Sequence, residues 1–288
     1  MYTLFGDTDL DMTIKEAREY GVKLISMPYV IGEEVTYPYK DSDEIDFHAF
    51  YDLLRKGVMP KTSALSPQEY IEYFEPEFKA GKDILYVHLS AAMSGTFNSM
   101  RLALNELKEK YPERKFYDID TKGITINSYI SFREICKMYK DGKSIEEIMK
   151  WAETEIDHFA TYFYATDLKF FQRSGRVKGF AAFMGGLIGI RPIINMNADG
   201  IMASCGKARG VKNSFEAILN TMKNLHVDVN KPIVVGHSDS LEEANRMIEL
   251  IKQRFGENVD ITLVEVNPTT GAHCGPGGVG VAFYGDHR

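Results

Sequence analysis

Apolar and polar residues follow one another along the chain in segments that predict strands and helices in turn. Residues 84–89 form a short apolar run with the length and composition of a buried strand. After a polar turn at 90–96, apolar side chains recur three or four residues apart from Phe97 to Leu107. That spacing is typical of a helix with one buried face. This stretch therefore predicts a strand, a turn and a helix.

The same alternation extends over the first half of the chain. Further strands and helices are expected at 2–5, 13–20, 22–27, 47–56, 70–79, 116–119, 135–139 and 144–156. Only the acidic stretch 29–46 has an irregular pattern that predicts no regular element. Strands that alternate with helices are typical of a parallel sheet covered by helices.

The pattern changes after His158. Strands are expected at 161–165, 193–196, 201–205, 233–236, 261–266 and 279–283, with helices at 168–172, 214–225 and 241–255. The turn Asn197–Gly200 predicts a hairpin, and the glycine-rich segment 271–278 predicts a loop that can approach a ligand. We therefore expect an α/β protein of two domains. An amino-terminal domain with a parallel sheet (1–158) would precede a carboxy-terminal α+β domain with a mixed sheet (159–288), and a ligand would lie between them.

Composition narrows the possible functions. The 288 residues are 44% apolar and carry a formal charge of -7, which argues against a nucleic-acid-binding protein. Cys136, Cys205 and Cys274 are far apart, so neither a disulfide framework nor a metal site is indicated. The chain begins without a signal-peptide pattern, and the apolar tract Gly179–Ile190 is too short to cross a bilayer. We expect a cytoplasmic, monomeric protein without a cofactor.

The polar turn at 90–96 offers hydrogen-bond donors to an anion. It contains Ser90, Ser94, Gly95 and Thr96 at the carboxyl end of a predicted strand, directly before a helix. The first N–H groups of a helix carry partial positive charge, so small anions bind there. The alternative is that Ser94 only caps the helix. The turn lacks the residue spacing of a phosphate-binding P-loop, a dinucleotide fingerprint or a hydrolase nucleophile elbow.

Five segments together resemble one protein family, in the right order over nearly the whole chain. They are Thr62-Ser63 after a proline, the turn Ser90 to Thr96, the segment Asp167 to Arg176, Lys207-Ala208-Arg209, and His273-Cys274-Gly275-Pro276-Gly277. The resemblance is to the DegV family, bacterial fatty-acid-binding proteins that serve as the lipid-carrying subunit of fatty acid kinase. The first strand differs from the usual pattern, because Gly6-Asp7-Thr8-Asp9 stands where the family has Asp-Ser.

The resemblance implies both a ligand and its site. The ligand is a long-chain fatty acid such as palmitate, stearate or oleate, whose carboxylate Thr62 and Ser94 would bind. Ser63, Gly95, Thr96 and His273 would lie close by. We expect neutral donors and a helix amino terminus to orient this head group without a buried Lys or Arg.

The resemblance also implies a partner, and the distribution of charge agrees. Between Asp167 and Lys212 the chain carries eight cations and two anions, whereas the remainder is strongly acidic. Such a basic segment attracts an acidic partner or an anionic membrane surface. Arg173, Arg176, Lys207 and Arg209 are therefore candidates for docking on a separate ATP-dependent kinase subunit, which would form an acyl phosphate that feeds phospholipid synthesis. Transient contact with the bilayer would allow lipid exchange.

Two other functions are compatible with the same residues. In a serine hydrolase acting on acyl esters, Ser94 would be the nucleophile, His273 the base, and Asp239 or Asp7 the orienting acid. In a protein interaction module, the apolar residues Phe180, Phe183, Met184 and Leu187 would belong to the core.

Overall fold

The computed structural model describes residues 1–40, 44–178 and 189–288. A four-stranded sheet, with the order β2-β1-β6-β7 and every pair parallel, occupies the amino-terminal half. Its strands are β1 (Tyr2–Asp7), β2 (Lys23–Ile25), β6 (Asp83–His88) and β7 (Phe116–Asp120). The predicted parallel sheet is confirmed.

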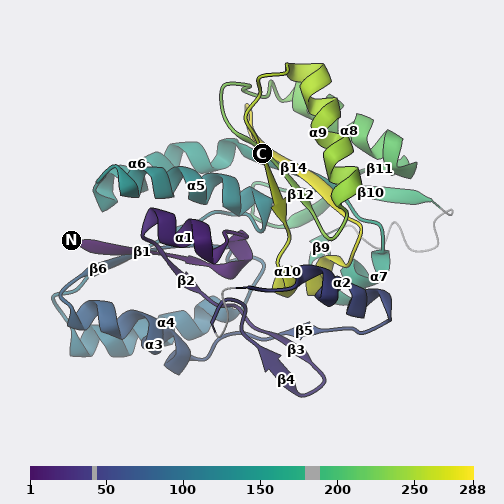
Figure 1. Ribbon diagram of the computed structural model, residues 1–288. Coiled ribbons are helices and arrows are strands. Elements are labelled where there is room, and N and C mark those ends of the chain that lie inside the picture. The colour runs from purple at the N-terminus through teal and green to yellow at the C-terminus, as the bar shows by residue number, and fades with distance from the viewer. Residues whose placement is uncertain (41–43, 179–188) are drawn as a thin grey trace.

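Helices cover both faces of this sheet. Along β6, Ile84 and Tyr86 pack against one group of helices, whereas Leu85 and Val87 face the other. This is why the strand is apolar throughout, since both of its faces are buried. Figure 1 shows α3 and α4 on one side of the sheet and α5 and α6 on the other. The helices are α1 (Ile14–Tyr20), α3 (Pro67–Lys79), α4 (Thr96–Lys110), α5 (Ile126–Lys140) and α6 (Ile145–Glu155).

A seven-stranded mixed sheet with the order β13-β12-β14-β8-β10-β11-β9 forms the second half. Its strands are β8 (Phe159–Tyr164), β9 (Val177–Lys178), β10 (Ile190–Met196), β11 (Met202–Arg209), β12 (Ile233–His237), β13 (Ile261–Glu265) and β14 (Val279–Tyr284). The predicted hairpin is present, because β10 and β11 pair antiparallel around Asn197–Gly200. Parallel pairing occurs between β12 and β13 and between β11 and β9. The expected mixed sheet is therefore confirmed.

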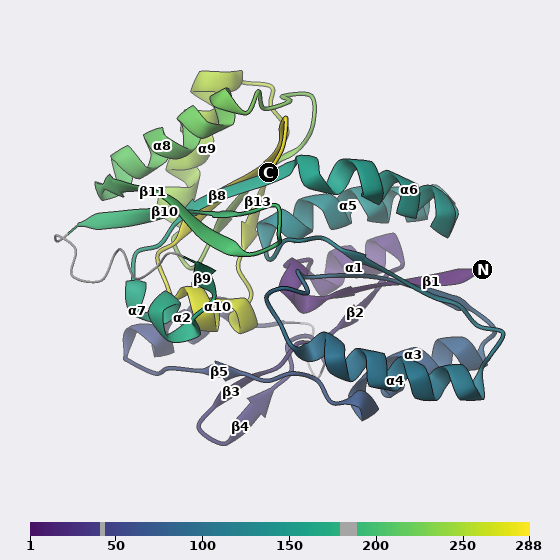
Figure 2. The ribbon, with the colours of Figure 1, turned by 180° about the vertical axis from the view of Figure 1, so that it is seen from behind.

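Helix α5 lies between the two sheets. The helices α8 (Gly210–Asn224) and α9 (Leu241–Phe255) pack on one face of the large sheet (Figure 2). Val234 and Ala282, from the opposite face, belong to the same apolar cluster as Ile126 and Ile130 of α5 and Leu4 of β1. The expected boundary after residue 158 falls at the end of a short 3-10 helix, η2 (Ile156–His158), just before β8. It remains a prediction, and the two sheets share a core across it.

A small third sheet corrects the prediction of an irregular stretch at 29–46. Strands β3 (Tyr29–Ile31) and β4 (Glu34–Thr36) form a hairpin, and β5 (Lys61–Thr62) pairs with β3. Each strand has only two or three residues and none is fully buried, so the sequence lacks a long apolar signal. The helix α2 (Phe47–Arg55) follows this hairpin as expected.

The prediction of a loop at 271–278 is wrong in its first half. Residues 268–274 form a helix, α10 (Pro268–Cys274), whose first turn is capped by Asn267 Oδ1, which accepts from the N–H groups of Thr269 and Thr270. Gly271 sits inside this helix because a Cβ there would lie 2.6 Å from the Tyr51 hydroxyl oxygen. The glycine allows close packing of two helices rather than loop flexibility. A further short helix, α7 (Leu168–Ser174), packs against α10.

Two sequence expectations concern membranes and the apolar tract. Within the described ranges, the helices are too short or too polar to cross a membrane. Most of the tract Gly179–Ile190, including Phe180, Phe183, Met184 and Leu187, lies outside the described residues.

Candidate functional site

Two adjoining cavities lie where the two halves of the chain meet. The first, called the polar cavity below, gathers side chains from β5, the turn before α4, the 3-10 helix η1 (Thr8–Leu10), the segment before β9, and α10. It is lined by Asp9, Met27, Thr62, Ser63, Leu89, Met93, Ser94, Thr96, Ile124, Arg176, Met202, Thr269, Thr270, His273 and Cys274. The structure thus places Thr62, Ser63, Ser94, Thr96 and His273 along one cavity, whereas Gly95 is not among its lining residues. Their roles toward a ligand remain predictions.

The second cavity, called the apolar cavity, continues between the start of α5 and the large sheet. Its lining is mostly hydrocarbon, with Ile126, Phe163, Phe171, Met196 and Val279 among its members. Both cavities share the same four lining residues, Ile124, Met202, Thr270 and Cys274. Polar walls and apolar walls therefore lie side by side at this junction.

The Ser94 hydroxyl is available as a hydrogen-bond donor. Ser94 Oγ accepts from the Thr96 backbone N–H at 3.3 Å, so its own hydrogen is left for another acceptor. The residue at the N-cap position of α4 is Gly95, which has no side-chain cap. The first N–H groups of α4 therefore add partial positive charge beside this hydroxyl.

Other hydroxyls of the predicted site are already engaged. Thr96 Oγ1 accepts from the Leu65 N–H at 3.2 Å and shares a 2.9 Å hydrogen bond with the Tyr70 hydroxyl. Ser90 Oγ donates to the Gly200 carbonyl at 2.7 Å, which joins the turn after β6 to the β10–β11 hairpin. Thr96 and Ser90 therefore shape the site. Ser63 lines the cavity and is exposed, whereas Gly95 is exposed at the start of α4 and does not line the cavity.

His273 contacts the second predicted carboxylate ligand directly. Its Nε2 lies 2.8 Å from Thr62 Oγ1, and its Nδ1 lies 3.5 Å from a terminal nitrogen of Arg176. Burial, and then the charges of Arg176 and Arg173, lower the pKa of His273 to about 3. The imidazole is therefore neutral at physiological pH.

Sequence reasoning did not anticipate the charged residues of the polar cavity. Arg176, partly buried, lines it, contrary to the expectation that no Lys or Arg would be there. Asp9 lines it too, and burial followed by the charge of Asp7 raises the pKa of Asp9 well above its usual range. Asp9 Oδ1 accepts from Thr270 Oγ1 at 3.1 Å. The only sequence signal for Asp9 was its departure from the usual pattern of the first strand.

The four predicted docking residues separate into two groups. Lys207 and Arg209 are exposed on β11. Arg173 is also exposed, although it donates to the Ala272 carbonyl at 2.9 Å and so links α7 to α10. Arg176 is turned inward, toward the polar cavity. Docking by these residues remains a prediction.

The hydrogen bonds contradict the arrangement required for a serine hydrolase. His273 Nε2 contacts Thr62 rather than Ser94, and its Nδ1 faces a guanidinium rather than a carboxylate. Asp239 is bonded to His48 and Arg55, and Asp7 to the Tyr86 hydroxyl and the Leu89 N–H. A base with a pKa of about 3 is also poorly matched to catalysis near neutral pH.

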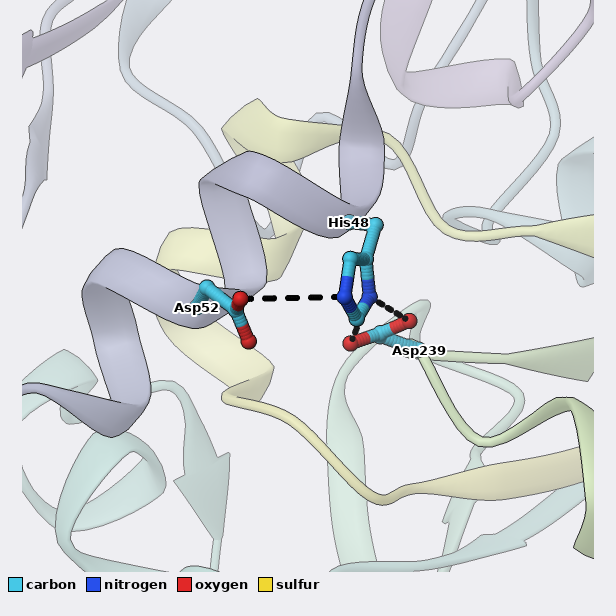
Figure 3. Close-up of side chains that lie close together, drawn as sticks. All are labelled: His48, Asp52 and Asp239. Carbon is cyan, nitrogen blue, oxygen red and sulfur yellow. Dashed lines mark hydrogen bonds and ion pairs between the residues drawn. The ribbon is translucent and has the colours of Figure 1, made fainter.

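A separate surface cluster of His48, Asp52 and Asp239 has ligand atoms within 4.8 Å of one another, but its side chains are already paired with one another and with Arg55. Figure 3 shows His48 between Asp52 and Asp239, with one carboxylate facing each ring nitrogen. The distances are 3.0 Å from Nδ1 to Asp239 Oδ1 and 3.6 Å from Nε2 to Asp52 Oδ2. Arg55 also forms ion pairs with both acids. As they stand, these contacts are ion pairs and hydrogen bonds that join α2 to the segment before α9.

Comparisons with known proteins agree with this architecture. A family model described as the DegV family matches residues 3–286. A DegV domain-containing protein of Clostridium perfringens is 32% identical over 288 residues, which cover 100% of this chain and 98% of that protein.

Solved structures share the fold at lower identity. A stearic acid-binding protein from Eubacterium ventriosum has a TM-score of 0.86 at 20% identity, with 99% of each chain covered. A fatty-acid-binding DegV family protein from Thermus thermophilus has a TM-score of 0.85 at 22% identity, again with 99% of each chain covered. Because the family model spans nearly every residue and a relative of similar length is more than 30% identical, the chain belongs to the DegV family.

Proposed function

We propose that this protein binds one long-chain fatty acid, such as palmitate, stearate or oleate. The carboxylate would lie in the polar cavity against Thr62 and Ser94, and the acyl chain in the apolar cavity. The observation that carries this proposal is the pair of adjoining cavities of opposite character, with four shared lining residues. Fatty-acid-binding relatives with the same fold support it.

The acyl chain supplies most of the affinity in this proposal. Burial of roughly 14 methylenes at about 0.8 kcal/mol each gives on the order of 11 kcal/mol, before the cost of association is subtracted. The head group adds orientation. A hydrogen bond to a charged acceptor contributes about 1.5–3 kcal/mol, so loss of one weakens binding roughly ten- to hundredfold.

The test has two parts. Organic extraction of the purified protein followed by mass spectrometry should detect a long-chain fatty acid, and delipidated protein should bind added palmitate. Thr62→Val and Ser94→Ala should each weaken palmitate binding roughly ten- to hundredfold. Ser144→Ala is a matched control, because Ser144 caps α6 and does not line either cavity. Protein that carries no acyl species and binds no palmitate would disprove the proposal.

We further propose that the bound carboxylate is presented to a separate ATP-dependent kinase subunit. A carboxylate oxygen would attack the γ-phosphorus of ATP, the bond to the β-phosphate oxygen would break, and acyl phosphate and ADP would result. The exposed cations Arg173, Lys207 and Arg209 support an acidic docking partner or contact with an anionic bilayer.

Charge reversal separates docking from ligand binding. Arg209→Glu should slow acyl phosphate formation by a reconstituted kinase while leaving palmitate affinity unchanged, whereas Lys108→Glu on α4 should change neither. An unchanged rate at low salt would move the docking surface elsewhere. Acyl phosphate made from ATP by this chain alone would overturn the division of labour.

A further inference from the structure

Arg176 connects the two segments that carry the head-group hydroxyls. Its Nε donates to the Met93 carbonyl at 3.3 Å, and Met93 directly precedes Ser94. A terminal nitrogen donates to the Ser174 carbonyl at 2.9 Å and lies 3.5 Å from His273 Nδ1. One guanidinium therefore contacts the Ser94 turn directly and reaches Thr62 through His273.

The guanidinium determines which ring nitrogen of His273 carries the hydrogen. A guanidinium has only donors, so the Nδ1 that faces it must present its lone pair. Burial, with the charges of Arg176 and Arg173, keeps the ring neutral by lowering its pKa to about 3. A neutral ring with an unprotonated Nδ1 carries its hydrogen on Nε2. That Nε2–H then donates to Thr62 Oγ1, 2.8 Å away.

This tautomer fixes the direction of the Thr62 hydroxyl. Thr62 Oγ1 accepts from His273, so its own hydrogen is left for the polar cavity that it lines. Ser94 is in the same state, because its Oγ accepts from the Thr96 N–H. Both hydroxyls thus offer donors to whatever occupies the cavity. An ionised carboxylate, which only accepts, matches two donors, whereas an alcohol brings a hydrogen of its own that must find an acceptor.

We propose that Arg176 is a positioning residue that fixes the His273 tautomer and the Thr62 and Ser94 donors, and thereby selects a carboxylate head group over an alcohol. This inference rests on the proposed fatty acid binding and assigns to Arg176 a role inside the site rather than in docking. Two variants test it. Arg176→Met removes the donors, and Arg176→Lys keeps the charge without the fork that reaches several acceptors. Lys212→Met is the matched control, because it removes one exposed cation from the same basic segment but lies on α8, outside both cavities.

The first measurement is the tautomer itself, by nitrogen-15 NMR of labelled histidine, with the His273 signals assigned from His273→Gln. The wild-type protein and Lys212→Met should show a protonated Nε2 and an unprotonated Nδ1. Arg176→Met should shift the ring toward the other tautomer. A protonated Nδ1 in the wild-type protein, or an Arg176→Met spectrum identical to wild type, would overturn the proposal.

The second measurement compares palmitate with 1-hexadecanol. Arg176→Met should lower palmitate affinity roughly ten- to hundredfold and narrow the preference for palmitate over the alcohol. The palmitate affinity of Arg176→Lys should lie between those of Arg176→Met and the wild-type protein. Because Arg176 is proposed to act through His273 and Thr62, Thr62→Val should weaken palmitate binding less in the Arg176→Met background than in the wild-type background. Strictly additive losses of binding free energy would refute this coupling between Arg176 and Thr62. A wild-type protein that binds no fatty acid would instead refute the proposed function, and the NMR result would still decide the tautomer.

Discussion

The proposal that the acyl chain lies in the apolar cavity can be tested by adding a single methyl group to the cavity wall. Gly236 on β12 faces Ile126 at the start of α5, and both residues line the cavity. In Gly236→Ala the new Cβ would lie 2.3 Å from Ile126 Cγ2, a distance that two carbons cannot keep. Ile126 is buried and β-branched, so its χ1 angle offers little freedom. The isoleucine must therefore move, and the shape of the cavity must change with it.

Gly236→Ala should change both the stability of the protein and its affinity for long-chain fatty acids. Overpacking of this kind costs about 1–3 kcal/mol of the free energy of unfolding. If the displaced side chain excludes two methylenes of the acyl chain, at about 0.8 kcal/mol each, stearate affinity falls roughly fifteenfold. Laurate, whose chain is shorter, should bind with nearly unchanged affinity. Calorimetric titration with laurate, palmitate and stearate measures how affinity depends on chain length.

Gly206→Ala is the control for this experiment. Gly206 lies on β11 of the same sheet, and a Cβ there would meet Ile193 Cβ at 3.8 Å, an ordinary contact. This variant should bind all three acids like the wild-type protein. The reasoning fails if Gly236→Ala binds stearate with wild-type affinity, because the acyl chain then lies elsewhere. It also fails if laurate is weakened as much as stearate.

Two further predictions concern stability. Burial raises the pKa of Asp11 from 3.8 to about 7. Between these two values the folded protein binds more protons than the unfolded chain. The contribution of Asp11 to the free energy of unfolding is therefore lost as the pH rises through 7. In urea titrations at pH 8, Asp11→Asn should be more stable than the wild-type protein by up to about 4 kcal/mol. Near pH 4 the two proteins should have the same stability, and an equal difference at both pH values would contradict the pKa argument. The buried Arg288 side chain donates to the carbonyls of Thr121, Lys122 and Ile156. Arg288→Met should therefore cost about 2–4 kcal/mol, whereas the exposed Lys108→Met should have little effect, and equal losses would argue against these hydrogen bonds.

Segments whose structure depends on local signals were predictable from sequence. The run 84–89 is apolar because both faces of β6 are covered, and it was recognised for that reason. Ser66 and Glu69 form a capping box at the start of α3, and the spacing of a serine and a glutamate three residues apart is itself a local sequence signal. The family motifs also located the hydroxyls and the histidine that the polar cavity brings together.

Features that depend on distant partners were not predictable in this way. Gly271 suggested a loop, yet it is a helical residue whose lack of a side chain makes room for Tyr51, far away in sequence. Arg176 suggested a docking surface because its charge is visible in the sequence, whereas the carbonyl of Met93 that draws it inward is not. The strands of the small third sheet are too short to produce a periodic signal.

The position of α5 has a consequence for how the protein can be divided. Residues of this helix contact the core of the first sheet on one side and Val234 and Ala282 of the second sheet on the other. A fragment ending at residue 158 would leave one side of α5 open to water, and a fragment from 159 onward would lose the cover of a sheet face. The halves should therefore melt in a single cooperative transition, and neither should be recovered as a folded fragment when expressed alone.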